Sequence, residues 1–162
     1  MKSSHIEIVK TLPVYVLANY LILKLLLVGY IFIHNMRNVE QGYYHIFFNN
    51  SSIELSLGTL ISPLILAPLF ETLFFCVLLY RFFKWLNPRN FFILFIISSA
   101  CMFSIFHLIN EGPRVFTILY TLLGGIIFAH CYKTQYVKYG ENKAYLSTSI
   151  VHSLANILNI LI

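Results

Sequence analysis

Long apolar runs, each interrupted by few polar residues, dominate the chain. A membrane-spanning helix needs about 20 mostly apolar residues. Five runs approach or reach this length: Thr11–His34, Ala67–Leu86, Asn90–Ile109, Arg114–Tyr132 and Tyr145–Ile162. A shorter run covers Ile53–Leu66, and we expect Pro63 and Pro68 to separate it from the next one, because proline disrupts a helix interior but suits its first turn. The pattern predicts an all-α, polytopic transmembrane helix bundle with about five spans and one short interfacial helix.

Composition supports a membrane protein and excludes a water-soluble one. Of the 162 residues, 59% are hydrophobic and only 10% are charged, whereas soluble domains carry about 25% charged residues. The mean hydropathy is +0.78. The length suits one helical bundle, so we predict a single transmembrane domain over residues 1–162 whose main partner is the lipid bilayer.

Basic residues are distributed unevenly between the two sides of the predicted bundle. Arg37 and Arg114 fall on one side, and Lys24 lies within the first span. The remaining eight fall on the other side: Lys2, Lys10, Arg81, Lys84, Arg89, Lys133, Lys138 and Lys143. Because positive charge favours the cytoplasmic side, we expect the amino terminus to be cytoplasmic. We expect the chain to be an integral membrane protein of a bacterial cell membrane. The same bias accounts for the net charge of +5, so we expect no nucleic-acid partner.

Four polar side chains stand out inside the apolar runs. Glu71 lies in "APLFETLFFC", where a charged group costs about 3 kcal/mol on insertion scales. His107 lies near the end of another run, and His152 and Asn156 are four residues apart, on one face of the last run. The predicted topology puts Glu71 about one turn inside the outer end of its helix, at a depth where all four groups can converge. Taken alone, His107 fits an interfacial side chain and Asn156 fits a helix–helix hydrogen bond, but the four together favour a site.

These residue types suit the hydrolysis of an amide without a covalent intermediate. A glutamate beside a neutral histidine can deprotonate and orient water, and a second histidine with an asparagine can donate hydrogen bonds to the developing oxyanion. The pattern therefore indicates Glu71, His107, His152 and Asn156 as catalytic residues, with no cofactor. Zinc stays open as an alternative, since Glu plus two His is a known ligand set, although the H-E-x-x-H signature does not occur in the chain.

At these positions the chain resembles the CPBP family of intramembrane proteases, which includes type II CAAX prenyl endopeptidases and proteins associated with bacteriocin processing or immunity. Its motifs E-E-x-x-x-R, F-x-x-x-H and H-x-x-x-N correspond to Glu71–Cys76, Phe103–His107 and His152–Asn156. The resemblance covers a catalytic core over residues 63–159. It implies that Glu71 and His107 activate the water, while His152 and Asn156 stabilise the oxyanion. Two positions depart from the motifs: Thr72 replaces the second glutamate and Cys76 replaces the arginine.

The resemblance leads to one main functional expectation and leaves two others open. The main expectation is an intramembrane endopeptidase that cleaves a membrane-associated peptide precursor or a lipid-modified, for example prenylated, protein. Because of Thr72 and Cys76, the alternative is a catalytically impaired member acting in bacteriocin immunity or as a regulatory membrane protein. A small carrier with Glu71 and the histidines as a proton relay is a third hypothesis, but the chain shows no pair of similarly interrupted helices.

Overall fold

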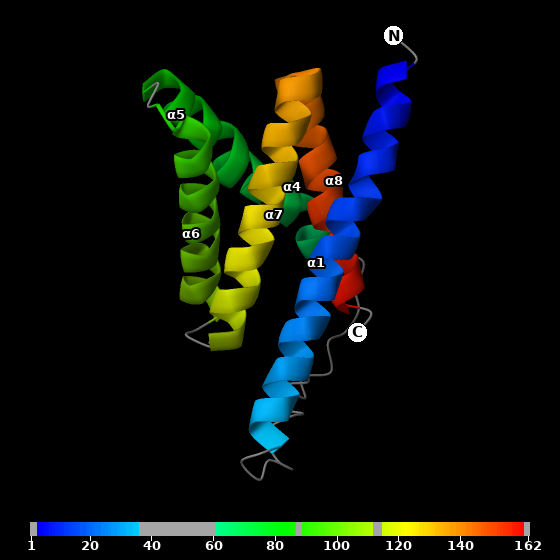
Figure 1. Cartoon of the computed structure of the whole chain (residues 1–162), viewed down its shortest axis with the longest axis vertical. Helices are drawn as coiled ribbons and strands as arrows, with labels where there is room; N and C mark the ends of the chain where they lie inside the picture. Colours follow the sequence, from blue (N-terminus) through cyan, green and yellow to red (C-terminus); the bar gives the residue numbers. More distant parts are fainter. Residues whose placement is uncertain (1–2, 36–60, 87–88, 112–114, 161–162) are drawn as a thin grey trace.

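The computed structural model describes the backbone of residues 3–35, 61–86, 89–111 and 115–160, and the described part is all-helical. Figure 1 shows the helices packed side by side as a bundle. Their bounds are α1 Ser3–Asn35, η1 Ser62–Leu66, α4 Ala67–Glu71, η2 Thr72–Leu78, α5 Leu79–Leu86, α6 Phe91–Glu111, α7 Val115–Tyr139 and α8 Glu141–Ile160. Among these residues, four stretches are long and apolar enough to cross a membrane: Thr11–Gly29, Ser62–Leu86, Phe91–Ile109 and Phe116–Tyr139. The predicted all-α membrane bundle is confirmed.

The segments η1, α4, η2 and α5 form one continuous helix, which corrects the predicted break before Ala67. Both prolines lie inside it, and residues 53–60 of the predicted interfacial helix lie outside the described residues. The helix continues because η1 and η2 are π-helical turns. In η1 the Ala67 amide donates to the Ser62 carbonyl, five residues back, and this wider winding accommodates Pro68, which has no amide hydrogen to offer.

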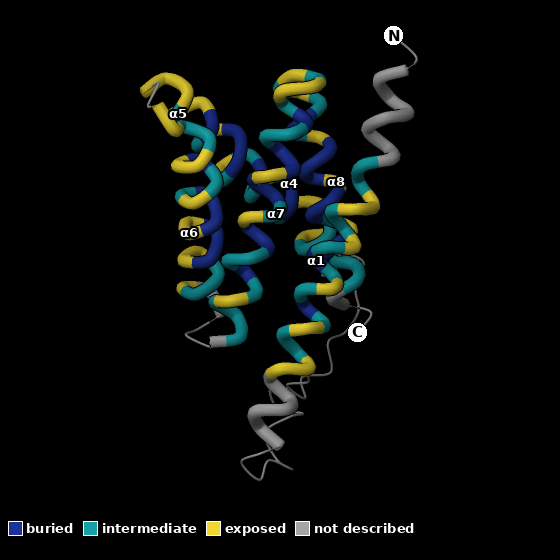
Figure 2. The backbone as a smooth tube through the Cα atoms, viewed as in Figure 1, coloured by how far each residue is buried: buried dark blue, intermediate teal, exposed yellow. Residues whose placement is uncertain are grey.

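Helices α6 and α7 pack very closely because small residues face each other. A Cβ atom added at Gly125 would lie 2.8 Å from the Ala100 Cα atom and 3.3 Å from the Phe103 Cβ atom. One turn away, the Thr121 hydroxyl oxygen lies 3.0 Å from Ser104 Oγ. Small residues that allow close backbone approach are typical of membrane helix interfaces. In Figure 2 the buried residues accordingly line the inward faces of the helices, while exposed residues face outward.

Helices α7 and α8 form a hairpin with a single residue, Gly140, between them. Gly140 has φ +81°, a left-handed conformation that glycine adopts without strain. Its amide donates to the Tyr136 carbonyl over 3.0 Å, and its carbonyl accepts from the Ala144 amide over 3.1 Å. Helix α7 therefore continues seven residues beyond the predicted end at Tyr132. The predicted connector is itself helical, and the two helices are held antiparallel and adjacent.

Helix α8 corresponds to the predicted fifth span, Tyr145–Ile162, but it is not among the four stretches that are apolar enough to cross a membrane. Its polar side chains lower its hydropathy, and many of them face inward rather than toward lipid. The buried polar residues of α8 are Ser147, Thr148, Ser149 and His152. Among the described residues, four stretches are therefore apolar enough to cross a membrane by length and composition, and α8 adds a helix with a polar inner face.

One end of the bundle carries most of the described basic residues. There Arg81 pairs with Glu141 across the α5–α8 ends, and the guanidinium lowers the pKa of the Glu141 carboxyl below its ordinary value. The Lys84 ammonium donates to the Tyr136 hydroxyl over 2.9 Å, and the Lys133 ammonium lies 4.9 Å from the centre of the Phe92 ring. Helix α1 begins at the same end (Figure 1). The charge asymmetry of the sequence thus appears as a charged end of the fold.

The close α6–α7 contact gives a first prediction. We expect Gly125→Ala to destabilise the protein by about 1–3 kcal/mol, the usual effect of overpacking, because the new methyl group would meet the Ala100 backbone. The matched control is Gly29→Ala in α1, where nothing lies within 4 Å of an added Cβ atom. Thermal unfolding in detergent measures both. Equal midpoints for the two variants would contradict the proposed close contact.

Candidate functional site

Glu71 lies at the junction of α4 and η2, where ordinary helical winding changes to π-helical winding. Such turns are rare and occur frequently at functional sites. The continuous helix begins at least nine residues before Glu71, at Ser62. The predicted depth, one turn inside the helix end, is therefore wrong, because the prolines do not start a new helix at Ala67. His107 lies about one turn before the end of α6, and His152 lies near the middle of α8.

Three helices bring Glu71 and the two histidines together. The Glu71 Oε2 atom lies 3.4 Å from His152 Nε2 and 3.6 Å from His107 Nε2. The side chains are 12%, 4% and 21% exposed for Glu71, His152 and His107, respectively. Both distances exceed those of strong hydrogen bonds, but catalytic hydrogen bonds are often long in ligand-free sites and shorten when substrate binds. The sequence prediction that these three residues converge agrees with this geometry.

Aromatic rings set the orientation of the two imidazoles. The His152 ring stacks on Phe128 at a centroid distance of 4.3 Å and meets Phe103 edge-on at 5.5 Å. The His107 ring lies 4.6 Å from the same Phe103 ring. Phe103 therefore contacts both imidazoles, and both Nε2 atoms lie within 3.6 Å of one carboxylate oxygen. Packing that fixes a side chain in this way pre-organises a site.

Asn156 makes a contact that the sequence did not predict. Its Nδ2 atom donates to the Pro63 carbonyl over 2.8 Å. In an ordinary α-helix this carbonyl would accept from the Ala67 amide, but that amide donates to Ser62. The next possible donor is Pro68, which has no amide hydrogen. Asn156 thus donates to a carbonyl that has no donor within the helix of Pro63. This bond attaches α8 to the helix that carries Glu71.

A second hydrogen bond joins α8 to the same helix. The Tyr145 hydroxyl donates to the Leu69 carbonyl over 3.3 Å, two residues before Glu71. Together with Asn156, it connects α8 to both η1 and α4. The position of Glu71 relative to His152 is therefore fixed by side-chain bonds to backbone as well as by packing.

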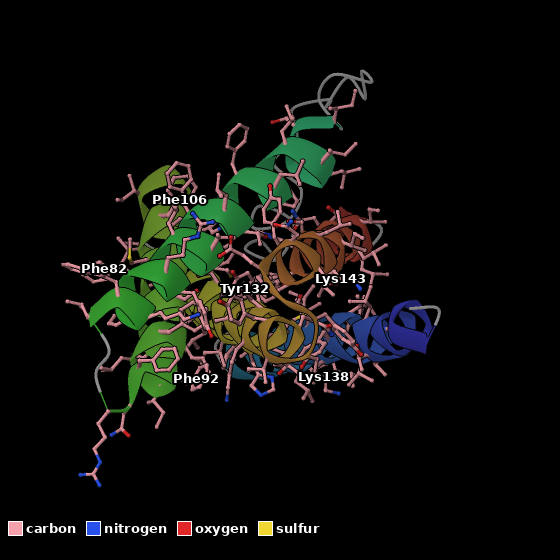
Figure 3. The ribbon with its side chains drawn as sticks, turned by 90° about the horizontal axis from the view of Figure 1, so that it is seen from above. Phe82, Phe92, Phe106, Tyr132, Lys138 and Lys143 are labelled. Carbon is pink, nitrogen blue, oxygen red and sulfur yellow. The ribbon has the colours of Figure 1, made fainter. Side chains whose placement is uncertain are left out.

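An apolar groove of about 600 Å³ begins at Glu71 and extends along η2 and α5, with α6 as its other wall. In Figure 3, which looks down on the bundle, Phe82 and Phe106 lie on the same outer side, away from Lys138 and Lys143. The groove is lined by Phe70, Glu71, Phe74, Phe75, Leu78, Leu79, Phe82, Met102 and Phe106. Its volume falls within the range of about 300–1,000 Å³ that is usual for ligand sites. Among the described residues that line it, Glu71 alone is charged.

This groove was not predicted from the sequence, although the sequence contains a repeat that accompanies it. Phe70, Phe74, Leu78 and Phe82 recur every four residues and share one helical face. All four are exposed large hydrophobic residues. In a membrane protein such residues are expected to face lipid anyway, so the repeat alone does not distinguish a groove from an ordinary lipid-facing surface.

The two positions that depart from the family motifs are both buried. Thr72 and Cys76 are each 2% exposed, on the inner side of η2. They line a second, much smaller cavity that also touches Glu71 and His152. Glu71 therefore borders two spaces, the outer groove and this inner cavity.

No group of three or more His, Cys, Asp or Glu in the described part of the chain is arranged to hold a metal ion. Glu71 and the two histidines come nearest in residue type, and the Glu71 Oε2 atom lies 3.4–3.6 Å from the two Nε2 atoms. Glu plus two His is a known zinc ligand set, so these contacts leave the zinc alternative open. The prediction of hydrolysis without a metal stays a prediction.

Comparison with known proteins identifies one family. The model of the family described as Type II CAAX prenyl endopeptidase Rce1-like matches residues 53–158, which is 106 of the 162 residues. No curated protein and no solved structure gives a match. The matched stretch contains the Glu71, His107 and His152 cluster as well as Asn156.

The Asn156 contact gives a second prediction. We expect Asn156→Ala to lower the free energy of unfolding by about 1–3 kcal/mol, since it leaves the part-buried Pro63 carbonyl without a donor. The matched control is Ser153→Ala on the same helix, because the Ser153 hydroxyl donates only to the Ser149 carbonyl of its own helix over 2.9 Å. Thermal unfolding in detergent compares the two. If Asn156→Ala is no less stable than Ser153→Ala, the attachment of α8 to η1 is unimportant.

Proposed function

Because the chain belongs to the family of Type II CAAX prenyl endopeptidase Rce1-like proteins, a family of membrane proteases, we propose that it is a glutamate-dependent intramembrane endopeptidase. Its reaction would be the hydrolysis of a peptide bond in a membrane-associated peptide precursor or a lipid-modified protein. The observation that carries the proposal is the carboxylate of Glu71 within 3.6 Å of two imidazoles from two other helices.

In the proposed reaction, Glu71 acts as the general base. A water molecule between Glu71 and His107 gives a proton to the carboxylate while its oxygen attacks the carbonyl carbon. His152 stabilises the oxyanion of the tetrahedral intermediate. Asn156 assists through the second hydrogen of its amide nitrogen, since an amide nitrogen carries two donors and one is used by Pro63. Collapse of the intermediate breaks the C–N bond, and the proton held by Glu71 moves to the leaving amine.

The groove supports a substrate with an extended apolar portion. From Phe70 to Phe82 it follows about three helical turns, roughly 18 Å at 1.5 Å per residue. Its walls are almost entirely apolar, and it ends at Glu71. A lipid-modified chain or a hydrophobic peptide could bury its apolar part along the helix and present a peptide bond to the carboxylate. An apolar site also strengthens the electrostatic interactions on which the reaction depends.

The basic residues at one end of the bundle indicate which end faces the cytoplasm. Arg81, Lys84, Lys133 and Lys138 lie near one end of the bundle, and basic residues favour the cytoplasmic side. We propose a bacterial cell membrane with the amino terminus in the cytoplasm. Because His107 lies near the opposite end of α6, this orientation favours a substrate that reaches the site from the bilayer or from outside.

The third prediction concerns Glu71. Cells carrying wild type, Glu71→Gln or no copy are compared by mass spectrometry of membrane and secreted peptides, with protein levels matched by immunoblot. We expect one set of peptide termini to disappear in both Glu71→Gln and the null, because loss of a general base lowers the rate by about 10²–10⁴-fold. The amide keeps the shape of the carboxylate, so folding should be preserved.

The same comparison tests the alternative of an impaired family member. If Glu71→Gln matches wild type and only the null differs, the protein acts in immunity or regulation by binding, and the proposal of proteolysis is wrong. Cys101→Ala serves as the neutral control, since Cys101 is an exposed residue of α6 that lines neither the groove nor the small cavity.

The fourth prediction concerns metal. We expect the purified protein to keep its peptidase activity after treatment with 1,10-phenanthroline or EDTA, because the proposed reaction activates the water with Glu71 and His107 and uses no metal ion. Activity that is lost on chelation and restored by zinc, but not by magnesium, would contradict a metal-independent mechanism.

A further inference from the structure

A small cavity lies on the inner side of Glu71, opposite the groove. About 10 Å³ of it is open to the centre of a water molecule, which is at the lower limit for holding one water. Residues from η2, α6, α7 and α8 form its walls together with Glu71: Thr72, Phe75, Cys76, Ser99, Phe103, Gly125, Phe128 and His152. The polar walls are contributed by Glu71, Thr72, Ser99 and His152, and the remainder is mostly apolar.

Thr72 provides the strongest indication of what this cavity binds. The residue is 2% exposed, and its hydroxyl oxygen has no hydrogen-bond partner among the described residues. A buried polar group without a partner is unfavourable and rare in folded proteins. We therefore expect the Thr72 hydroxyl to have a hydrogen-bond partner, and the cavity that Thr72 lines has room for one.

The usual intrahelical partner does not satisfy the Thr72 hydroxyl. A threonine in a helix commonly donates to the carbonyl four residues back, which here is Pro68. That carbonyl already accepts the Thr72 backbone amide, which it shares with the Leu69 carbonyl. Thr121 in α7 shows the ordinary arrangement, since its hydroxyl donates to the Thr117 carbonyl over 2.7 Å. Thr72 differs, since its hydroxyl makes no such bond to its own helix.

We propose that Thr72 holds one structural water in this cavity, and that the water bridges the Thr72 hydroxyl to the Glu71–His152 pair. A bound water needs two to four polar partners, and the hydroxyl, Ser99, the carboxylate and the imidazole all border the cavity. Thr72 is then a positioning residue that orients Glu71 through the water. Where the family motif has a second glutamate, this chain uses a hydroxyl and a water.

The water site is tested by stability, which does not depend on catalysis. Thr72→Val keeps the shape of the side chain but removes the hydroxyl, and Thr72→Ser keeps the hydroxyl. We expect Thr72→Val to unfold in detergent at a lower temperature than wild type, and Thr72→Ser to unfold at a higher temperature than Thr72→Val. The control is Cys101→Ala, because Cys101 is an exposed residue of α6 that lines neither the groove nor this cavity. We expect this control not to lower the unfolding temperature.

The opposite order would overturn the water site. If the Thr72 hydroxyl binds nothing, Thr72→Val replaces an unpaired polar atom with a methyl group, and the variant will be as stable as wild type or more stable. This outcome is clear whether or not the protein is a protease.

The positioning role rests on the proposed function and is tested by kinetics on the substrate found with Glu71→Gln. We expect Thr72→Val to lower kcat by roughly tenfold or more, as when outer partners of catalytic side chains are removed, with KM unchanged and Thr72→Ser close to wild type. Unchanged kcat in Thr72→Val overturns the positioning role. Wild-type protein that cleaves nothing instead overturns the proposed function, and the stability comparison still decides the water site.

Discussion

A carboxylate inside an apolar bundle has to be met by polar groups from other helices, and this constraint organises the whole structure. An isolated charge in a hydrocarbon span is unfavourable by several kcal/mol. Glu71 is met by His107 from α6 and His152 from α8, so three helices have to converge at one depth. Gly125 allows α6 and α7 to approach closely, and Gly140 turns α8 back against α7. The two glycines therefore help to bring together the helices that carry the three titratable side chains.

The prolines before Glu71 create a second requirement. A helix that contains Pro63 and Pro68 cannot satisfy every backbone carbonyl internally, and in a membrane no water replaces the missing donors. In this helix, π-helical turns change the backbone hydrogen bonding around the prolines, and the Asn156 amide donates to the Pro63 carbonyl. Asn156, four residues after His152, thus supplies a hydrogen-bond donor that is missing from the backbone of the helix that carries Glu71. Such a coupling makes the backbone irregularity part of the site, because a change in η1 would move Glu71 relative to His152.

Much of this arrangement could be predicted from sequence, and the limits have physical causes. Apolar length predicted the helices around Glu71 and His107, and the high energetic cost of buried charge predicted that Glu71 and the histidines meet. The continuity through Pro68 could not be predicted, because it depends on π-helical winding and on a donor from α8, which is distant in sequence. The single-residue link at Gly140 was missed because the basic residues around it resemble a connector. Helix α8 is less apolar than the other four predicted spans, since the polar face of that helix turns inward.

The two spaces on either side of Glu71 resolve a conflict that any hydrolase within a membrane faces. The substrate's apolar part needs a dry surface, whereas a general base needs hydrogen-bond partners that fix its charge and direction. Here the groove is almost wholly apolar, and the inner cavity collects Thr72, Ser99 and His152. Neighbouring residues of a helix point in different directions. Glu71 can therefore border the groove while Thr72, the next residue, faces the inner cavity. If Thr72 positions the carboxylate as proposed, its departure from the family motif changes how the carboxylate is held without exposing the groove to polar groups.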